Sequence, residues 1–199
     1  MKTRILAILV VTICLAVIGY GTLAFFTDEA VAHNVITTGG VAIEIVETQR
    51  DEDTGTEVPY PDSPLAGVMP GQSVSKIVTV KNKEESSMAW IRVAVNISGQ
   101  FADGTAIMPD QLSVIRFQPN ETYWMYDEEE GYYYHKEPVD SGEQTNPLFK
   151  EIKFAPEMGN EFQNCTVYID VSADAVQYAN NPIPEGKDVT AIPGWPNNT

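Results

Sequence analysis

Cysteine and histidine are scarce in this chain of 199 residues, which has two of each. Cys14 lies inside the one long apolar run, so removal of that run leaves Cys165 without a partner for an intramolecular disulfide. This excludes a disulfide-stapled scaffold, and an exported protein without disulfides is more typical of a bacterial surface than of a small animal secretory domain. We expect Cys165 to be a buried small hydrophobic residue.

Positive charge is also scarce. The chain has 12 Lys and Arg against 28 Asp and Glu, a formal net charge of -16. Such a surface repels phosphate backbones and anionic lipid headgroups, so we expect no nucleic acid partner and membrane contact only through an uncleaved N-terminal segment. The length allows one domain with a real core, and a second independent domain would be cramped.

The recurring sequence motifs of enzymes are missing too. The histidines, His33 and His135, are far apart and outside any His-Glu-x-x-His motif, so no zinc-ligand pattern is present. We expect His33 to be a polar residue of an N-terminal arm and His135 a strand-surface partner of tyrosines. DEDTGTE, from Asp51, begins like a calcium loop, but Gly55 and Thr56 stand where a ligand and a glycine are needed. No nucleophile elbow, phosphate loop or dinucleotide fingerprint occurs. We therefore expect no catalytic residue, no metal and no cofactor.

The one long apolar run is N-terminal. MKTR supplies a basic start, ILAILVVTICLAVIGYGTLA an apolar stretch, and Ala24 a small residue at a plausible cut site. The run is also long enough to span a bilayer, so an uncleaved anchor is the alternative. Gly19 and Gly21 interrupt the helix just before Ala24, which favours an extended backbone at a peptidase site. The sequence thus predicts a helical signal peptide over residues 1–24, cut between Ala24 and Phe25.

The stretch GTLAFFTDEAVAHNVITTGGVAIEI resembles the start of the TasA and camelysin family of exported Gram-positive proteins. The family pattern is Gly-Thr-x-Ala-[Tyr/Phe]-Phe-[Ser/Thr]-Asp, then Asn-x-[Phe/Ile]-x-x-Gly, then a strand. The matching positions are Gly21, Thr22, Ala24, Phe25, Phe26, Thr27, Asp28, Asn34, Ile36, Gly39 or Gly40, and the strand from Val41. The resemblance implies cleavage after Ala24 by a signal peptidase of the SipW type, and secretion to the extracellular matrix or cell surface.

Alternating apolar and polar residues after this region predict strands. The clearest are AWIRVAVNIS from Ala89 and CTVYIDVSADAV from Cys165, with further strands in VAIEIVE and SVSKIVTV. TYWMYDEEEGYYYHK predicts a β-hairpin whose acidic tip ends at Gly131. The prediction is an all-β fold, an antiparallel β-sandwich. A jelly-roll-like topology is what the family resemblance implies, since strand spacing alone does not separate it from an immunoglobulin-like one.

The expected organisation has four parts. Residues 1–24 form the signal peptide, 25–40 an N-terminal arm or first strand, 41–180 the sandwich domain, and 181–199 a Pro-rich tail over the surface. Residues 48–72 are rich in Pro, Gly and acids and predict a long exposed loop within the domain. A turn or two of helix is possible near Gln111 and near Ala173.

The arm suggests how such a protein acts. After cleavage it opens with Phe25 and Phe26, which favour any apolar groove that accepts them. Added as a strand to the sheet edge of a neighbouring copy, through residues that include Val31, Val35 and Ile36, the arm would link subunits head to tail into a homopolymer. The resemblance implies the same donor-strand assembly into biofilm matrix fibres. The alternative is that the arm forms the first strand of its own sandwich.

Two other functions stay open. The aromatic hairpin suggests a monomeric surface binding module for a glycan or a host protein. In that case Tyr132, Tyr133 and Tyr134 would stack sugars together with Trp124, although core and cross-strand packing is the use we expect. The third possibility is a metalloprotease like camelysin, which the family resemblance suggests and the missing zinc motif argues against.

Overall fold

The computed structural model describes residues 35–37, 40–67 and 69–196. The predicted signal peptide and arm residues 25–34 lie outside this part of the chain. The described residues form β-strands and four short 3-10 helices, η1 (Gln111–Val114), η2 (Asn160–Phe162), η3 (Tyr178–Asn180) and η4 (Val189–Ala191), without an α-helix. Among them, no helix has the length and apolar character needed to cross a bilayer.

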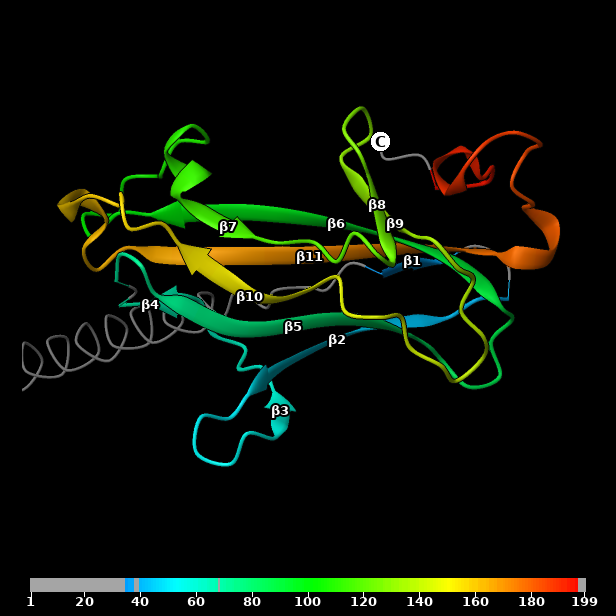
Figure 1. The fold of residues 1–199 in the computed structure, drawn as a ribbon, viewed down its shortest axis with the longest axis horizontal. Coiled ribbons are helices and arrows are strands. Elements are labelled where there is room, and N and C mark those ends of the chain that lie inside the picture. Colours follow the sequence, from blue (N-terminus) through cyan, green and yellow to red (C-terminus); the bar gives the residue numbers. More distant parts are fainter. Residues whose placement is uncertain (1–34, 38–39, 68, 197–199) are drawn as a thin grey trace, which may run out of the picture. The chain divides into compact units, whose positions relative to one another are not determined.

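Two sheets pack face to face (Figure 1). The first has the order β1-β11-β6-β9-β8, with a short β4 also paired to β11. Its strands are β1 (Val35–Thr37), β4 (Leu65–Ala66), β6 (Ala89–Gln100), β8 (Trp124–Asp127), β9 (Tyr132–His135) and β11 (Thr166–Gln177). The second has the order β3-β2-β5-β10-β7. Its strands are β2 (Ile43–Arg50), β3 (Glu57–Pro59), β5 (Ser73–Asn82), β7 (Ile115–Phe117) and β10 (Phe149–Phe154). The predicted all-β sandwich is confirmed.

The strand order settles the topology that spacing left open. In an immunoglobulin-like sandwich the last two strands share a sheet. Here β10 pairs with β5 and β11 pairs with β6, so the last two strands lie in opposite sheets. Apart from the β2–β3 and β8–β9 connections, the chain thus passes from one sheet to the other between successive strands, as in a jelly roll. Every strand pair is antiparallel apart from β1 with β11, which is parallel.

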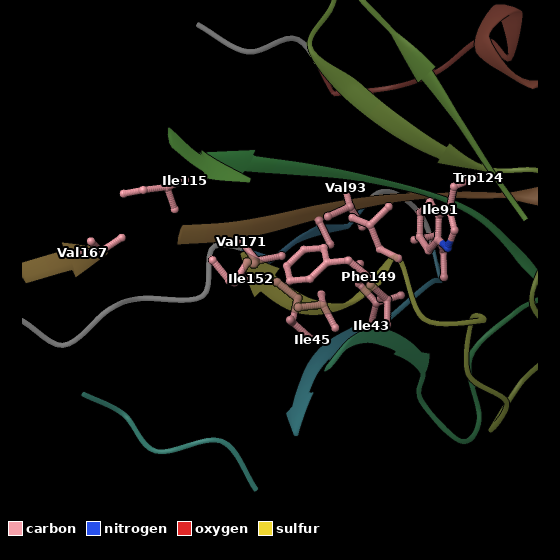
Figure 2. Close-up of a cluster of buried hydrophobic side chains, with 14 of the residues drawn as sticks. Ile43, Ile45, Ile91, Val93, Ile115, Trp124, Phe149, Ile152, Val167 and Val171 are labelled. Carbon is pink, nitrogen blue, oxygen red and sulfur yellow. The ribbon is translucent and has the colours of Figure 1, made fainter. Parts of the chain in front are cut away.

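The core lies between the sheets and follows the predicted alternation. Ile91 and Val93 of β6 are fully buried, as is Val167 of β11. Figure 2 shows Phe149 between these β6 side chains and the β2 side chain Ile43. Cys165 is buried in the same core, as expected for a small hydrophobic residue.

The structure departs from the expectations in two places. The segment 48–72, expected to be a long exposed loop, contains β3 on the edge of β2 and β4 on the edge of β11. The region near Ala173, where a helical turn was possible, lies within β11, whereas the turn near Gln111 is present as η1. In both places pairing to a neighbouring strand decides the local structure, and this is tertiary information that composition does not carry.

The C-terminal residues 183–196 lie over the outer face of the first sheet. They cover a second apolar cluster, made up of Trp90, Tyr132, Tyr134, Val176, Val189 and Ile192, with Ile183 and Trp195 packed against it. The indole Nε1 of Trp90 donates a hydrogen bond to the carbonyl oxygen of Asn181, 2.9 Å away. Because of this cover, the outer face of β6 is buried near Trp90, although its alternating pattern suggests a face open to solvent.

Candidate functional site

The described part of the predicted assembly arm is β1, which contains Val35 and Ile36. Val35 pairs with Ala173 and Ile36 with Asp174, so this end of the arm is an edge strand of its own sheet. Phe25, Phe26 and Val31, like the cleavage position Ala24, lie outside the described residues. Residues 35–37 therefore form a strand of their own chain's sandwich, which is the alternative given in the sequence analysis.

Beside β1 lies a stretch of the β11 edge that no other described strand pairs with. β4 pairs with Thr166 and Val167 of β11, and β1 begins its pairing at Ala173. Between them, residues 168–172 of β11 have no strand on this side among the described parts of the chain, although β6 pairs with them on the other side. An unpaired edge presents free N–H and C=O groups, which are a template for another strand. Five residues of extended chain, roughly 17 Å, would fill the interval.

Two buried charges lie on the inner face of the second sheet. Lys76 shares the inward side of β5 with Val78 and Val80, and its Nζ is 2.7 Å from Oε2 of Glu47. The Lys76 side chain is 4% exposed and that of Glu47 is 13% exposed. Tyr60 lies against the pair, with its ring centroid 3.9 Å from Nζ of Lys76.

The charge of Asp170 on β11 also acts on this pair. Burial lowers the pKa of Lys76, and the nearby charges of Glu47 and Asp170 oppose that shift. Burial, with the Glu47 charge, raises the pKa of Tyr60 to about 12. Asp170 lies in the middle of residues 168–172 of β11, so the field of the buried pair reaches this part of the strand. A pair of this kind is costly to desolvate and is better suited to fixing a local arrangement than to adding net stability.

The outer face of the first sheet holds another buried charge, Arg92. Its Nε donates to Oδ2 of Asp174 at 2.9 Å, and its Nη1 donates to Oε2 of Glu130 at 3.0 Å. Its Nη2 donates to the carbonyl oxygen of Pro196, also at 3.0 Å. The guanidinium lies between the rings of Tyr132 and Trp195. Sequence reasoning missed this cluster, although an arginine amid the apolar alternation of β6 is a signal for a partnered buried charge.

The hairpin residues considered as a sugar platform do not lie together. Trp124 is buried on the inner face of the hairpin, packed into the core between the sheets. Tyr132 and Tyr134 are buried on the opposite face beneath the C-terminal residues. Tyr133 lies on the inner face, opposite Tyr126. The expected packing role is therefore confirmed for Trp124, Tyr132 and Tyr134.

His135 differs from its predicted position on the strand surface. It is 4% exposed, and its ring meets that of Trp124 edge-on, with 4.9 Å between centroids. Its Nδ1 lies 2.7 Å from the carbonyl oxygen of Glu137. Burial lowers the pKa of His135, so the ring is neutral at pH 7. The prediction was wrong because the alternation of this strand puts His135 on the same face as Trp124, toward the core.

In the acidic loop that begins at Asp51, the Asp51 carboxylate accepts hydrogen bonds from other residues of the same loop. Oδ1 of Asp51 accepts hydrogen bonds from the backbone N and from Oγ1 of Thr54, each at 2.8 Å. These bonds lower the pKa of Asp51. In the part of the chain that the structure describes, no three His, Cys, Asp or Glu side chains are grouped as ligands for a metal ion. His33 lies outside this part.

Comparisons with protein-family models, with curated proteins and with solved structures give no match for this chain. The resemblance to the TasA and camelysin family therefore depends on the N-terminal residues quoted above.

Proposed function

We propose that this chain is a secreted structural protein of the extracellular matrix or cell surface, and that it assembles into fibres through its N-terminal strand after the signal peptide is removed. The observation that carries the proposal is the parallel pairing of β1 with β11, which makes the end of the arm an edge strand of the first sheet. The sequence supports it with a predicted cut after Ala24, which would leave an arm that begins at Phe25.

The register of β1 supports this proposal. Continued toward the N-terminus, the parallel pairing of Val35 with Ala173 would set Val31 opposite Ile169. Ile169 packs against the core from the inner face of β11, so an apolar partner at this position would extend buried surface. The same edge accepts the arm of its own chain or that of a neighbour. A neighbour's arm leaves that neighbour's own edge free for the next copy, and this open, repeating contact produces a filament.

Truncation tests the proposal. Three proteins are compared by negative-stain microscopy and size-exclusion chromatography: residues 25–199, residues 35–199, which keep β1, and residues 41–199, which lack it. We expect filaments from the first alone. Filaments from residues 35–199 would show that the arm is dispensable, and a monomer from all three would remove the assembly proposal.

A disulfide trap shows whether the arm that pairs with β11 belongs to the same chain or to a neighbouring copy. With Cys165→Ser as background, Ala32→Cys and Asp170→Cys are introduced at positions that face each other in the continued register. A disulfide within monomers would show that each chain completes its own sheet. A ladder of multimers on non-reducing gels, abolished by reductant, is the outcome that strand exchange predicts. The single variant Asp170→Cys controls for adventitious cross-linking.

Processing can be tested separately. We expect mass spectrometry of the protein from the culture medium of a Gram-positive host with a SipW-type peptidase to find Phe25 at the N-terminus. Recovery of the intact chain in the membrane fraction would favour the anchor instead.

A further inference from the structure

Four aromatic rings are in contact one after another from the core to the surface. Phe149 in the core meets Phe117 of β7, with 4.5 Å between centroids. Phe117 meets Tyr133 at 5.7 Å, and Tyr133 meets Tyr126 at 4.5 Å with an angle of 30° between their planes. Phe149 is 1% exposed and Tyr126 is 49% exposed. The outermost ring is therefore presented to solvent on a rigid, packed base.

The two faces of the β8–β9 hairpin differ in how far their aromatic side chains are buried. Tyr132 and Tyr134, on one face, are buried under the C-terminal residues and Trp195. On the other face Tyr126 stays exposed beside a shallow cavity of about 300 Å³. The cavity is lined by Pro119, Glu121, Trp124, Met125, Tyr126, Tyr133 and Lys136. The C-terminal residues thus bury the aromatic residues of the covered face, whereas Tyr126 packs on Tyr133 with its outer side exposed.

The polar groups of this cavity suit a hydroxyl-rich ligand. Lys136 and Glu121 are both exposed at its rim, and Nζ of Lys136 donates to the backbone carbonyl oxygen of Glu121. The ammonium group has donors to spare, and the Glu121 side chain is an acceptor. A pair of neighbouring sugar hydroxyls can accept from the first and donate to the second, while the C–H face of the pyranose ring covers the ring of Tyr126. The net charge of -16 disfavours a polyanionic ligand.

We propose that the Tyr126 face of the β8–β9 hairpin is a binding site for one or two pyranose units of a neutral polysaccharide. The site is separate from the β11 edge and does not depend on strand exchange. In a fibre it would give every subunit a point of attachment to a surrounding glycan, and in a monomer it would serve as a surface binding site.

The test uses the chain without its apolar leader, residues 25–199, and a panel of neutral probes. These are hexamers of β-1,4-linked glucose, β-1,4-linked N-acetylglucosamine and α-1,4-linked glucose, together with dextran. Binding is measured by isothermal titration calorimetry and, for the polymer, by affinity electrophoresis. We expect at least one probe to bind, Tyr126→Ala to weaken its binding by about tenfold or more, and Tyr126→Phe to stay within about threefold of the parent.

Two controls make the result specific. Tyr178→Ala removes a tyrosine of similar exposure, 43%, which lies in η3 outside the lining of the cavity, and should leave binding unchanged. Deletion of residues 25–34 should also leave it unchanged, which separates this proposal from the assembly proposal. The sugar site would be refuted by the absence of binding for all four probes at millimolar concentration, or by equal binding of Tyr126→Ala. It would also be refuted if a decaproline peptide bound at Tyr126 in place of the sugars.

Discussion

The guanidinium carbon of Arg92 lies 3.9 Å from the ring centroid of Tyr132, and the ring of Trp195 lies 4.9 Å away. This arrangement holds Trp195 and Pro196 against the first sheet. The Arg92 side chain is 4% exposed and that of its partner Asp174 is 6% exposed, so the charge pair is desolvated as well as stacked.

Replacement of Arg92 by alanine should be severely destabilising. It would leave the Asp174 carboxylate buried without its charged partner, which typically costs about 3–5 kcal/mol. The free energy of unfolding from urea titration checks this expectation. Lys83→Ala is the matched control, because its pair with Glu44 is 3.8 Å long and about half exposed on both sides. This control should cost about 1 kcal/mol or less. Similar losses for both variants would contradict a special role for the Arg92 cluster.

The buried pair of Lys76 and Glu47 should show strong coupling in a double-mutant cycle. Lys76→Met alone leaves the Glu47 carboxylate without its cation, and Glu47→Leu alone leaves the ammonium without its anion. Each single change should cost about 3–5 kcal/mol, while the double change should recover most of that loss. Urea unfolding of the four proteins gives the coupling energy. Additive losses would mean that the 2.7 Å contact contributes little.

His135 predicts a dependence of stability on pH. Burial lowers its pKa below the ordinary 6.5, so the folded protein resists protonation that the unfolded chain accepts. The contribution of His135 is complete above pH 6.5 and is lost as the pH falls from there through the lower folded pKa. Unfolding measured between pH 7.5 and pH 5 should show this decline, and His135→Gln should flatten it. An unchanged slope in the variant would assign the decline to other groups.

Removal of residues 183–199 should expose the second apolar cluster. Trp90 and Tyr132 would lose their cover, so we expect binding of the dye ANS together with lower stability. The sandwich core between the sheets involves other side chains, and its strand content should persist in far-UV circular dichroism. A truncated protein with unchanged stability and no dye binding would show that these residues contribute nothing to the fold.

Gly99 is a position where an added methyl group should destabilise the protein. A Cβ there would lie 2.9 Å from Cδ1 of Ile107 and 2.9 Å from the backbone oxygen of Thr166 on the paired strand. Gly99→Ala should therefore destabilise the protein by about 1–3 kcal/mol in urea unfolding. Trimming the side chain with Ile107→Ala should not restore stability, because the backbone oxygen of Thr166 remains in the way.

The sequence predicted the elements whose pattern is local. The alternation of β6 identified its inner face, with Ile91 and Val93 in the core, and the hairpin turn at Gly131 was found from its acidic tip. β10 went unnoticed for a physical reason. A bulge between Phe149 and Glu151 puts Phe149 and Ile152 on the same buried face, three positions apart, and this breaks the period of two that marks a strand.

The candidate sites were harder to predict because they depend on contacts between distant segments. The Arg92 cluster needs Trp195, whose position over the sheet no local pattern indicates. The aromatic run of the hairpin was recognised, but which rings are covered depends on the C-terminal residues. Tyr126 stands out only once the other face of the hairpin is known to be buried.

The pairing of β1 with β11 has a consequence for how the chain folds as it is made or exported. A chain that leaves a ribosome or a translocation channel N-terminus first presents Val35 long before Ala173, its partner. The first sheet therefore cannot close until nearly the whole chain has emerged, and such long-range pairing is slow to form. The topology itself thus delays completion of the first sheet until the residues of β11 are available to pair with β1.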